Sequence, residues 1–97
     1  MPYAITLQDP PEDITERAQR EAEQRFRRTL EKALGGADAV PAAHRAWQTA
    51  QDTTEGEMSP EEITLARRWI AATTTARSEG LKEIGEGEAW FEVRMER

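Results

Sequence analysis

The feature that most constrains the fold of this 97-residue chain is its shortage of large apolar side chains. Apolar types make up 37% of the sequence, but 15 of these residues are alanine, which leaves 21 larger side chains. Leu, Ile, Val and Phe total 14 residues, a share below the ~20% at which disorder has to be considered. Disorder also needs a high net charge, and here 19 acidic residues face 13 basic ones, for a net charge of -6. The composition therefore predicts one small folded domain, residues 1–97, with a thin core.

Several classes of protein are disfavoured by what the sequence lacks. No window approaches the ~20 apolar residues of a membrane span, and the N-terminus lacks the basic-then-apolar pattern of a signal peptide. Without cysteine the chain has no disulfide, thiolate zinc site, iron–sulfur cluster or cysteine nucleophile. We therefore expect a cytoplasmic protein that makes no membrane contact. A sequence pI near 4.8 also disfavours general nucleic-acid binding, because such domains usually carry a basic excess.

Both ends of the chain show the alternation of a half-buried strand. Residues 3–7 alternate large apolar residues with small or polar ones, the large ones being Tyr3, Ile5 and Leu7. Near the C-terminus, apolar and charged residues alternate in the same way, the apolar ones being Phe91, Val93 and Met95. Residues 81–84 are a candidate third strand, which would pair with residues 89–95 through a hairpin at residues 85–87.

Three helices are expected between the strands. The first begins at residue 11 or 13 and ends at residue 34, before the glycines at 35 and 36, which accept a left-handed cap. The second covers residues 39–52. The third begins at Ser59, where a serine cap, Pro60 and Glu62 form the capping-box pattern, and it ends near residue 79. Its buried side is expected to carry Ile63, Leu65, Ala66, Trp69, Ile70, Thr73 and Ala76.

Together these elements predict an α+β fold. The three helices pack on a small two- or three-stranded sheet formed by the N- and C-terminal strands. Pairing of the two ends follows from the strand pattern at both termini and the short connections between the helices.

Residues with catalytic potential are few. His44 is the only histidine and has no acidic residue three or four positions away, so we expect it to be structural or exposed. The serines, Ser59 and Ser78, lie in no nucleophile motif. Glu86 and Glu88 flank a glycine without the spacing of a calcium loop. The sequence therefore predicts no catalytic site, metal site, cofactor or small-molecule substrate, and no enzyme activity.

The first candidate binding surface is the aromatic pair near the C-terminus. Adjacent residues of a strand point to opposite faces, so an inward Phe91 turns Trp90 outward beside Glu92 and Arg94. An exposed tryptophan is a suitable contact anchor. Two other arrangements remain open: a loop of the same chain covers Trp90, or the register is reversed and Trp90 lies inside at a bulge.

The second candidate surface is the outer face of helix 59–79. If residues 81–95 formed a wing, this face would meet DNA through Thr64, Arg67, Arg68, Thr75 and Ser78. Glu61 and Glu62 argue against it, because they occupy the helix N-terminus, where phosphates would repel them. A polar face turned to solvent is the simpler interpretation.

Scarce apolar side chains and the open edges of so small a sheet both favour association. We therefore expect a homodimer or a complex with another protein. The expected contact residues are Trp90, Glu92, Arg94, Arg67, Arg68 and Trp69.

The leading hypothesis for function is a non-enzymatic, acidic protein-binding module of regulator or inhibitor type. Its size, its acidity and its lack of catalytic residues are similar to those of inhibitors that mobile elements encode against host machinery. The alternative is a winged-helix-like DNA-binding transcriptional regulator that uses the outer face of helix 59–79.

Overall fold

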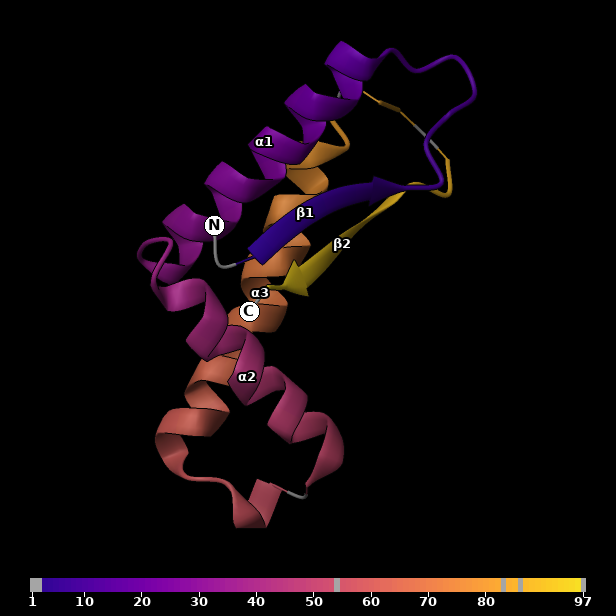
Figure 1. The fold of residues 1–97 in the computed structure, drawn as a ribbon. Coiled ribbons are helices and arrows are strands. Elements are labelled where there is room, and N and C mark those ends of the chain that lie inside the picture. Colours follow the sequence, from indigo (N-terminus) through magenta and orange to yellow (C-terminus); the bar gives the residue numbers. More distant parts are fainter. Residues whose placement is uncertain (1–2, 54, 83, 86, 97) are drawn as a thin grey trace.

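The two ends of the chain form the sheet in the computed structural model, which describes residues 3–53, 55–82, 84–85 and 87–96. Strand β1 (Tyr3–Gln8) pairs antiparallel with β2 (Trp90–Met95). Between them lie α1 (Glu16–Leu34), α2 (Ala39–Asp52), the short 3-10 helix η1 (Glu55–Glu57) and α3 (Pro60–Gly80). Figure 1 shows the strands side by side in front of α3, with α1 alongside. The expected α+β fold, with three helices on a sheet made by both chain ends, is confirmed.

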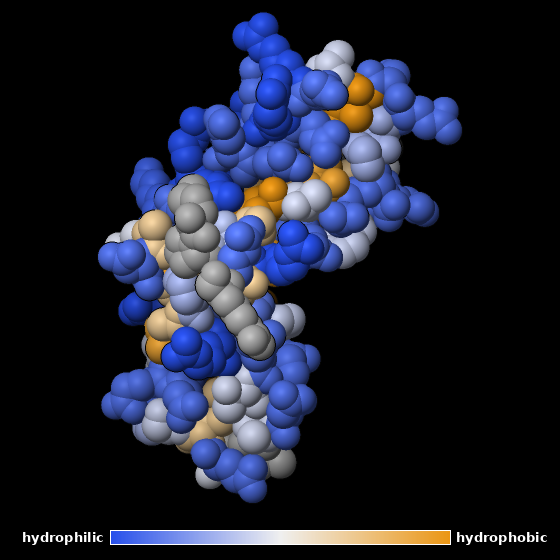
Figure 2. Space-filling view, viewed as in Figure 1, coloured by the Kyte–Doolittle hydropathy of each residue, from blue (hydrophilic) through white to orange (hydrophobic). Residues whose placement is uncertain are grey.

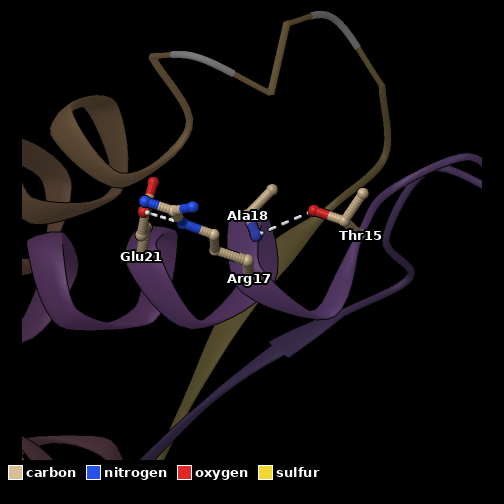
Figure 3. A network of polar contacts seen from close by, with 4 residues as sticks. All are labelled: Thr15, Arg17, Ala18 and Glu21. Carbon is tan, nitrogen blue, oxygen red and sulfur yellow. Dashed lines mark hydrogen bonds and ion pairs between the residues drawn. The ribbon is translucent and has the colours of Figure 1, made fainter.

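Helix α1 begins later than the sequence predicts. Its cap is Thr15, whose side-chain oxygen accepts a hydrogen bond from the Ala18 amide at 3.0 Å (Figure 3). The preceding residues form a turn instead, in which the Ile14 amide donates to the Pro11 carbonyl at 3.1 Å. The helix ends as expected at Leu34, where Gly35 has the left-handed φ of 95° that glycine adopts without strain.

The start of α3 is as predicted. The Ser59 hydroxyl accepts from the Glu62 amide at 3.2 Å, and the Glu62 carboxylate accepts from the Ser59 amide at 3.1 Å. This reciprocal capping box, with Pro60 in the first turn, fixes where the helix begins.

The predicted hairpin over residues 81–84 is wrong for the described residues. Leu81, Lys82 and Ile84 lie in turns that continue from α3, and the Ile84 amide donates back to the Leu81 carbonyl at 3.1 Å. Residues 83 and 86 are outside the described residues. In the part of the chain that the structure describes, β2 therefore pairs with β1 alone.

The main core draws on both strands and all three α-helices. Its buried residues are Tyr3, Ile5, Leu7, Ala22, Phe26, Leu30, Leu34, Val40, Ala43, Trp69, Ala72, Ala76 and Phe91. The inward face of the sheet is as the alternation predicts, with Phe91 stacked on Phe26 at a ring-centroid distance of 4.5 Å. Trp90 points outward and is 45% exposed, so the outward arrangement is confirmed.

Tyr3 joins β1 to α1 through a partly buried polar contact. Its hydroxyl donates to the Glu31 carboxylate, and the Arg27 guanidinium lies 4.7 Å from the centre of its ring. Burial, together with the neighbouring Glu31 carboxylate, raises the pKa of Tyr3 to about 12.

The buried face of α3 differs from the prediction at two positions. Ile70, expected inside, is 53% exposed, whereas Ala72 is buried. Successive residues of a helix are rotated by about 100°, so with Trp69 pointing inward Ile70 turns to solvent and Ala72 returns to the core side. Small residues on this face let α3 lie close to α1 and α2, namely Ala66, Ala72, Ala76 and Gly80.

The molecule is elongated, with principal extents of 46 × 24 × 22 Å. Figure 2 shows a mostly hydrophilic face with hydrophobic patches over the sheet, and an outline that is hollowed between the sheet and the α2 end. Among the described residues, no helix has the length and apolar character needed to cross a bilayer.

Candidate functional site

A groove of about 350 Å³ runs along β2. Four consecutive residues of the strand, 90–93, line it. Because consecutive residues point to opposite faces of a sheet, a groove that all four border follows the edge of the strand. The other edge of β2 is paired with β1, so this is the free edge. We call this feature the Trp groove; it is lined by Phe26, His44, Trp47, Trp69, Thr73, Thr74, Arg77, Trp90, Phe91, Glu92 and Val93.

All three tryptophans of the chain line the Trp groove, each from a different element. Trp47 comes from α2, Trp69 from α3 and Trp90 from β2. The rings of Trp47 and Trp69 are 6.3 Å apart between centroids, and Trp69 is only 5% exposed. The groove therefore has a deep aromatic wall at Trp69 and an exposed aromatic side at Trp90, an arrangement suited to apolar or aromatic groups.

His44 belongs to the same aromatic cluster. Its ring lies edge-on to Trp69, with centroids 5.0 Å apart and planes at 77°, and its centroid is 5.8 Å from that of Trp47. Burial among these rings lowers the pKa of His44, since the charged form would lose its water. Its ring contacts are aromatic, so it packs as a core side chain, in line with the structural role expected for it.

The polar groups of the groove are few. Arg77 on α3 and Glu92 on β2 supply one charge of each sign. The Thr73 hydroxyl donates to the Trp69 carbonyl at 2.9 Å and the Thr74 hydroxyl to the Ile70 carbonyl at 2.8 Å. Both hydroxyl hydrogens are therefore bonded within α3 and are not offered to a ligand.

The Trp groove brings together three of the six residues predicted to contact a partner. Trp90 and Glu92 line it from β2, and Trp69 lines it from α3. Trp69 lies on the buried side of its helix, as the sequence predicts, and its indole is packed in the core beside His44. Arg94 is exposed on the same face of β2 as Glu92.

The two remaining predicted contact residues lie elsewhere on α3. Arg67 and Arg68 are exposed and do not line the groove. Arg68 borders a shallow depression at the start of the helix, next to Glu61. Arg67 and Arg68 therefore do not belong to the surface that Trp90 and Glu92 form.

Trp47 and Arg77 are among the groove residues that were not singled out as candidates from the sequence. No local pattern identifies them, because the groove forms only when α2, α3 and β2 meet in space. The one available signal was the presence of three tryptophans in a chain otherwise poor in large apolar residues.

The acidic pair Glu86 and Glu88 is not a described site, because residue 86 lies outside the described residues. Among the residues that the structure describes, no three His, Asp or Glu side chains gather as metal ligands. No protein-family model, curated protein or solved structure matches this chain.

Proposed function

We propose that this protein is a small, non-enzymatic, cytoplasmic protein-binding module. Its binding surface is the Trp groove together with the free edge of β2. The observation that carries this proposal is that all three tryptophans line one groove beside an unpaired strand edge. Aromatic residues in a partly enclosed groove are typical anchors of protein interfaces, and natural proteins seldom leave a strand edge open.

The chemistry of the groove favours binding over catalysis. The His44 ring contacts two indoles, and among the described residues no hydroxyl or carboxylate is hydrogen-bonded to it for activation. Arg77 and Glu92 provide charges that fix orientation, whereas the aromatic rings provide contact area. A module of this size acts by occupying a surface of its partner, which is how a regulator or an inhibitor of the kind encoded by mobile elements works.

The alternative, a winged-helix-like DNA-binding regulator, has less support. Its wing would be formed by residues 81–95, but β2 pairs with β1 and Leu81 and Ile84 lie in turns. Glu62 is held at the N-terminus of α3 by the capping box, where it would oppose a phosphate. A gel shift on random duplex DNA at low salt tests this function, and binding that disappears in the Arg67→Glu/Arg68→Glu variant would favour it over ours.

The proposed function is tested by photo-crosslinking in cells of the native host. A photoreactive amino acid replaces Trp90 and, in a matched control, the exposed residue Gln24 on α1. We expect a protein adduct that forms from position 90 and not from position 24, with mass spectrometry identifying the protein captured. Equal labelling from both positions, or no adduct from position 90, would overturn the proposal.

A further inference from the structure

The backbone of β2 presents hydrogen-bonding groups along its free edge. The Leu7 amide of β1 donates to the Glu23 carboxylate of α1 at 2.8 Å, so this amide points away from β2. In an antiparallel pair of strands, directly opposite residues alternate between two kinds. One pair exchanges backbone hydrogen bonds, and in the next pair the backbone N–H and C=O groups of both residues point away from the partner strand. Because Leu7 is opposite Phe91, the outward-pointing residues of β2 are Phe91, Val93 and Met95.

The two edges of the sheet therefore differ in how far they are covered by the rest of the chain. Glu23 covers part of the β1 edge from α1. Along β2, no other described segment pairs with the strand, and the Trp groove leaves space beside it. An edge of this kind accepts an additional strand, which gains main-chain hydrogen bonds.

The side chains of β2 are self-complementary about Val93. A second, antiparallel copy centred on this residue places Glu92 opposite Arg94 of the second copy, and the reverse pair forms symmetrically. On the inner face, the same register places Phe91 opposite Met95, a favourable sulfur–aromatic pair. The backbone N–H and C=O groups of Val93 point to the free edge. This register therefore also aligns backbone donors of one copy with backbone acceptors of the other.

Within one chain, neither Glu92 nor Arg94 is paired across the sheet with a residue of opposite charge. β1 places Thr6 opposite Glu92 and Ala4 opposite Arg94. Among the ion pairs that the structure describes, neither Glu92 nor Arg94 takes part in one. A second copy of β2 supplies both with a partner of opposite sign, which a strand of arbitrary sequence would not.

The exposed apolar surface lies next to the Trp groove and the free edge of β2. The large apolar residues most open to solvent are Trp90 and Ile70. Ile70 precedes the groove residues Thr73 and Thr74 by three and four positions, so it belongs to the same stripe of α3. A two-fold axis through Val93, perpendicular to the sheet, brings the α3 helices of both copies together on one face and covers this stripe.

The accessible surface of the single chain exceeds that of a typical monomer. It is 6739 Å², whereas a monomer of 11.0 kDa exposes about 5,600 Å². The surplus of about 1,100 Å² is comparable with the ~800 Å² that each partner buries in a standard stable interface. The chain thus exposes enough additional surface for one such contact.

We propose that two copies of this chain associate through β2 and form one antiparallel sheet in the order β1-β2-β2-β1, with the two-fold axis at Val93. This inference rests on the proposed function, since a second copy becomes the protein that the Trp groove and the strand edge bind. It names the partner and fixes the register of the contact.

Charge exchange across the interface tests the proposal, with mass measured by light scattering across the micromolar range. The wild-type protein is expected at twice the 11.0 kDa of one chain. Glu92→Arg and Arg94→Glu each create two like-charge pairs per dimer and weaken dimerisation at least about tenfold. An equimolar mixture of the two variants restores the dimer, because every pair in the mixed dimer is again opposite in sign.

Matched controls change charge on exposed residues away from β2. Asp52→Arg at the end of α2 and Arg28→Glu on α1 are expected to leave the dimer intact. Far-ultraviolet circular dichroism of each variant shows that it is folded. A wild-type monomer throughout the range, or a dimer insensitive to both β2 variants, would overturn the inference.

The register is tested by disulfide formation, since the chain contains no cysteine. Glu92→Cys mixed with Arg94→Cys places the two thiols in directly opposite positions and gives a crosslinked dimer under mild oxidation. Either variant alone places them on a diagonal of about 7–8 Å, beyond disulfide reach. Crosslinking of the single variants as fast as the mixture would contradict pairing about Val93.

The crosslink from position 90 in cells separates this inference from the proposed function. An adduct with a second copy supports both of them. An adduct with another protein, together with a monomeric mass in solution, overturns self-association and leaves the protein-binding function in place. Absence of an adduct specific to position 90 removes the proposed function as well.

Discussion

Gly80 and Phe91 are in contact so close that no side chain fits between them. A Cβ atom on Gly80 would lie 2.6 Å from Phe91 Cζ and 3.3 Å from the Ala22 carbonyl oxygen. The last turn of α3 therefore approaches both β2 and α1 through a residue without a side chain. This contact places Phe91, and with it the start of β2, against the helices.

Gly80→Ala is predicted to destabilise the protein by about 1–3 kcal/mol, since an added methyl group overpacks the site. Urea denaturation measures the change. Gly87→Ala is the control, because a Cβ there meets nothing within 4 Å. The smaller ring-free side chain of Phe91→Leu should recover part of the loss in the double variant. Equal stabilities of the Gly80→Ala and Gly87→Ala variants would show that the contact is not tight.

The pKa of Tyr3 gives a prediction at high pH. Tyr3 is the only tyrosine, so its ionisation can be followed by ultraviolet difference absorbance, with a midpoint expected at about 12. The unfolded chain loses this proton near 10.0 and the folded chain later. Raising the pH between these values therefore favours unfolding, and the stability that Tyr3 contributes below pH 10 is lost. Tyr3→Phe should lack this part of the pH dependence; a midpoint near 10 in the folded protein would contradict it.

Local patterns were sufficient to predict most elements. The alternation around Ile5 and Val93 identified both strands because burial on one face imposes a period of two. The serine, proline and glutamate at the start of α3 identified that terminus because the capping box involves only neighbouring residues. The start of α1 was misplaced because two prolines and Asp13 resemble a helix start, whereas Thr15 makes the capping bond.

Features that depend on packing could not be predicted in this way. Ile70 and Trp69 are adjacent and both apolar, and only the position of α3 between α1 and α2 decides which of them is buried. The Trp groove depends equally on the relative placement of α1, α2, α3 and β2. An exposed Trp90 was one of three arrangements that the sequence left open, and no local pattern shows that Trp47 and Trp69 line the same groove.

Ile70 and Leu30 are apolar residues of equal size, and Ile70 is exposed whereas Leu30 is fully buried. Ile70→Ala is predicted to change the stability of the monomer by less than about 0.5 kcal/mol, whereas Leu30→Ala, at a fully buried position, costs about 2–5 kcal/mol. Both are measured by urea denaturation at low protein concentration in the Glu92→Arg background, where association is weakened. A loss for Ile70→Ala as large as that for Leu30→Ala would mean that Ile70 is packed within the chain.

The burial of His44 among indoles gives a prediction near neutral pH. Its pKa lies below the ordinary 6.5 in the folded protein, so the unfolded chain binds a proton first as the pH falls. Stability therefore rises with pH between the folded and unfolded pKa values, by at most about 1.4 kcal/mol per pH unit for one proton. Acidifying from above 6.5 should lower the melting temperature of the wild type.

His44→Gln isolates this effect from the titration of carboxylates. The variant retains a polar side chain of similar length but has no proton to bind in this range, so its melting temperature should change less between pH 7.5 and about pH 5.5. Because the His44 ring contacts both Trp47 and Trp69, protonation should also alter the tryptophan fluorescence of the wild type and not of the variant. If both proteins lost stability in parallel on acidification, the charged form of His44 would have to be tolerated inside the groove, and the aromatic cluster would not be the apolar wall that its geometry indicates.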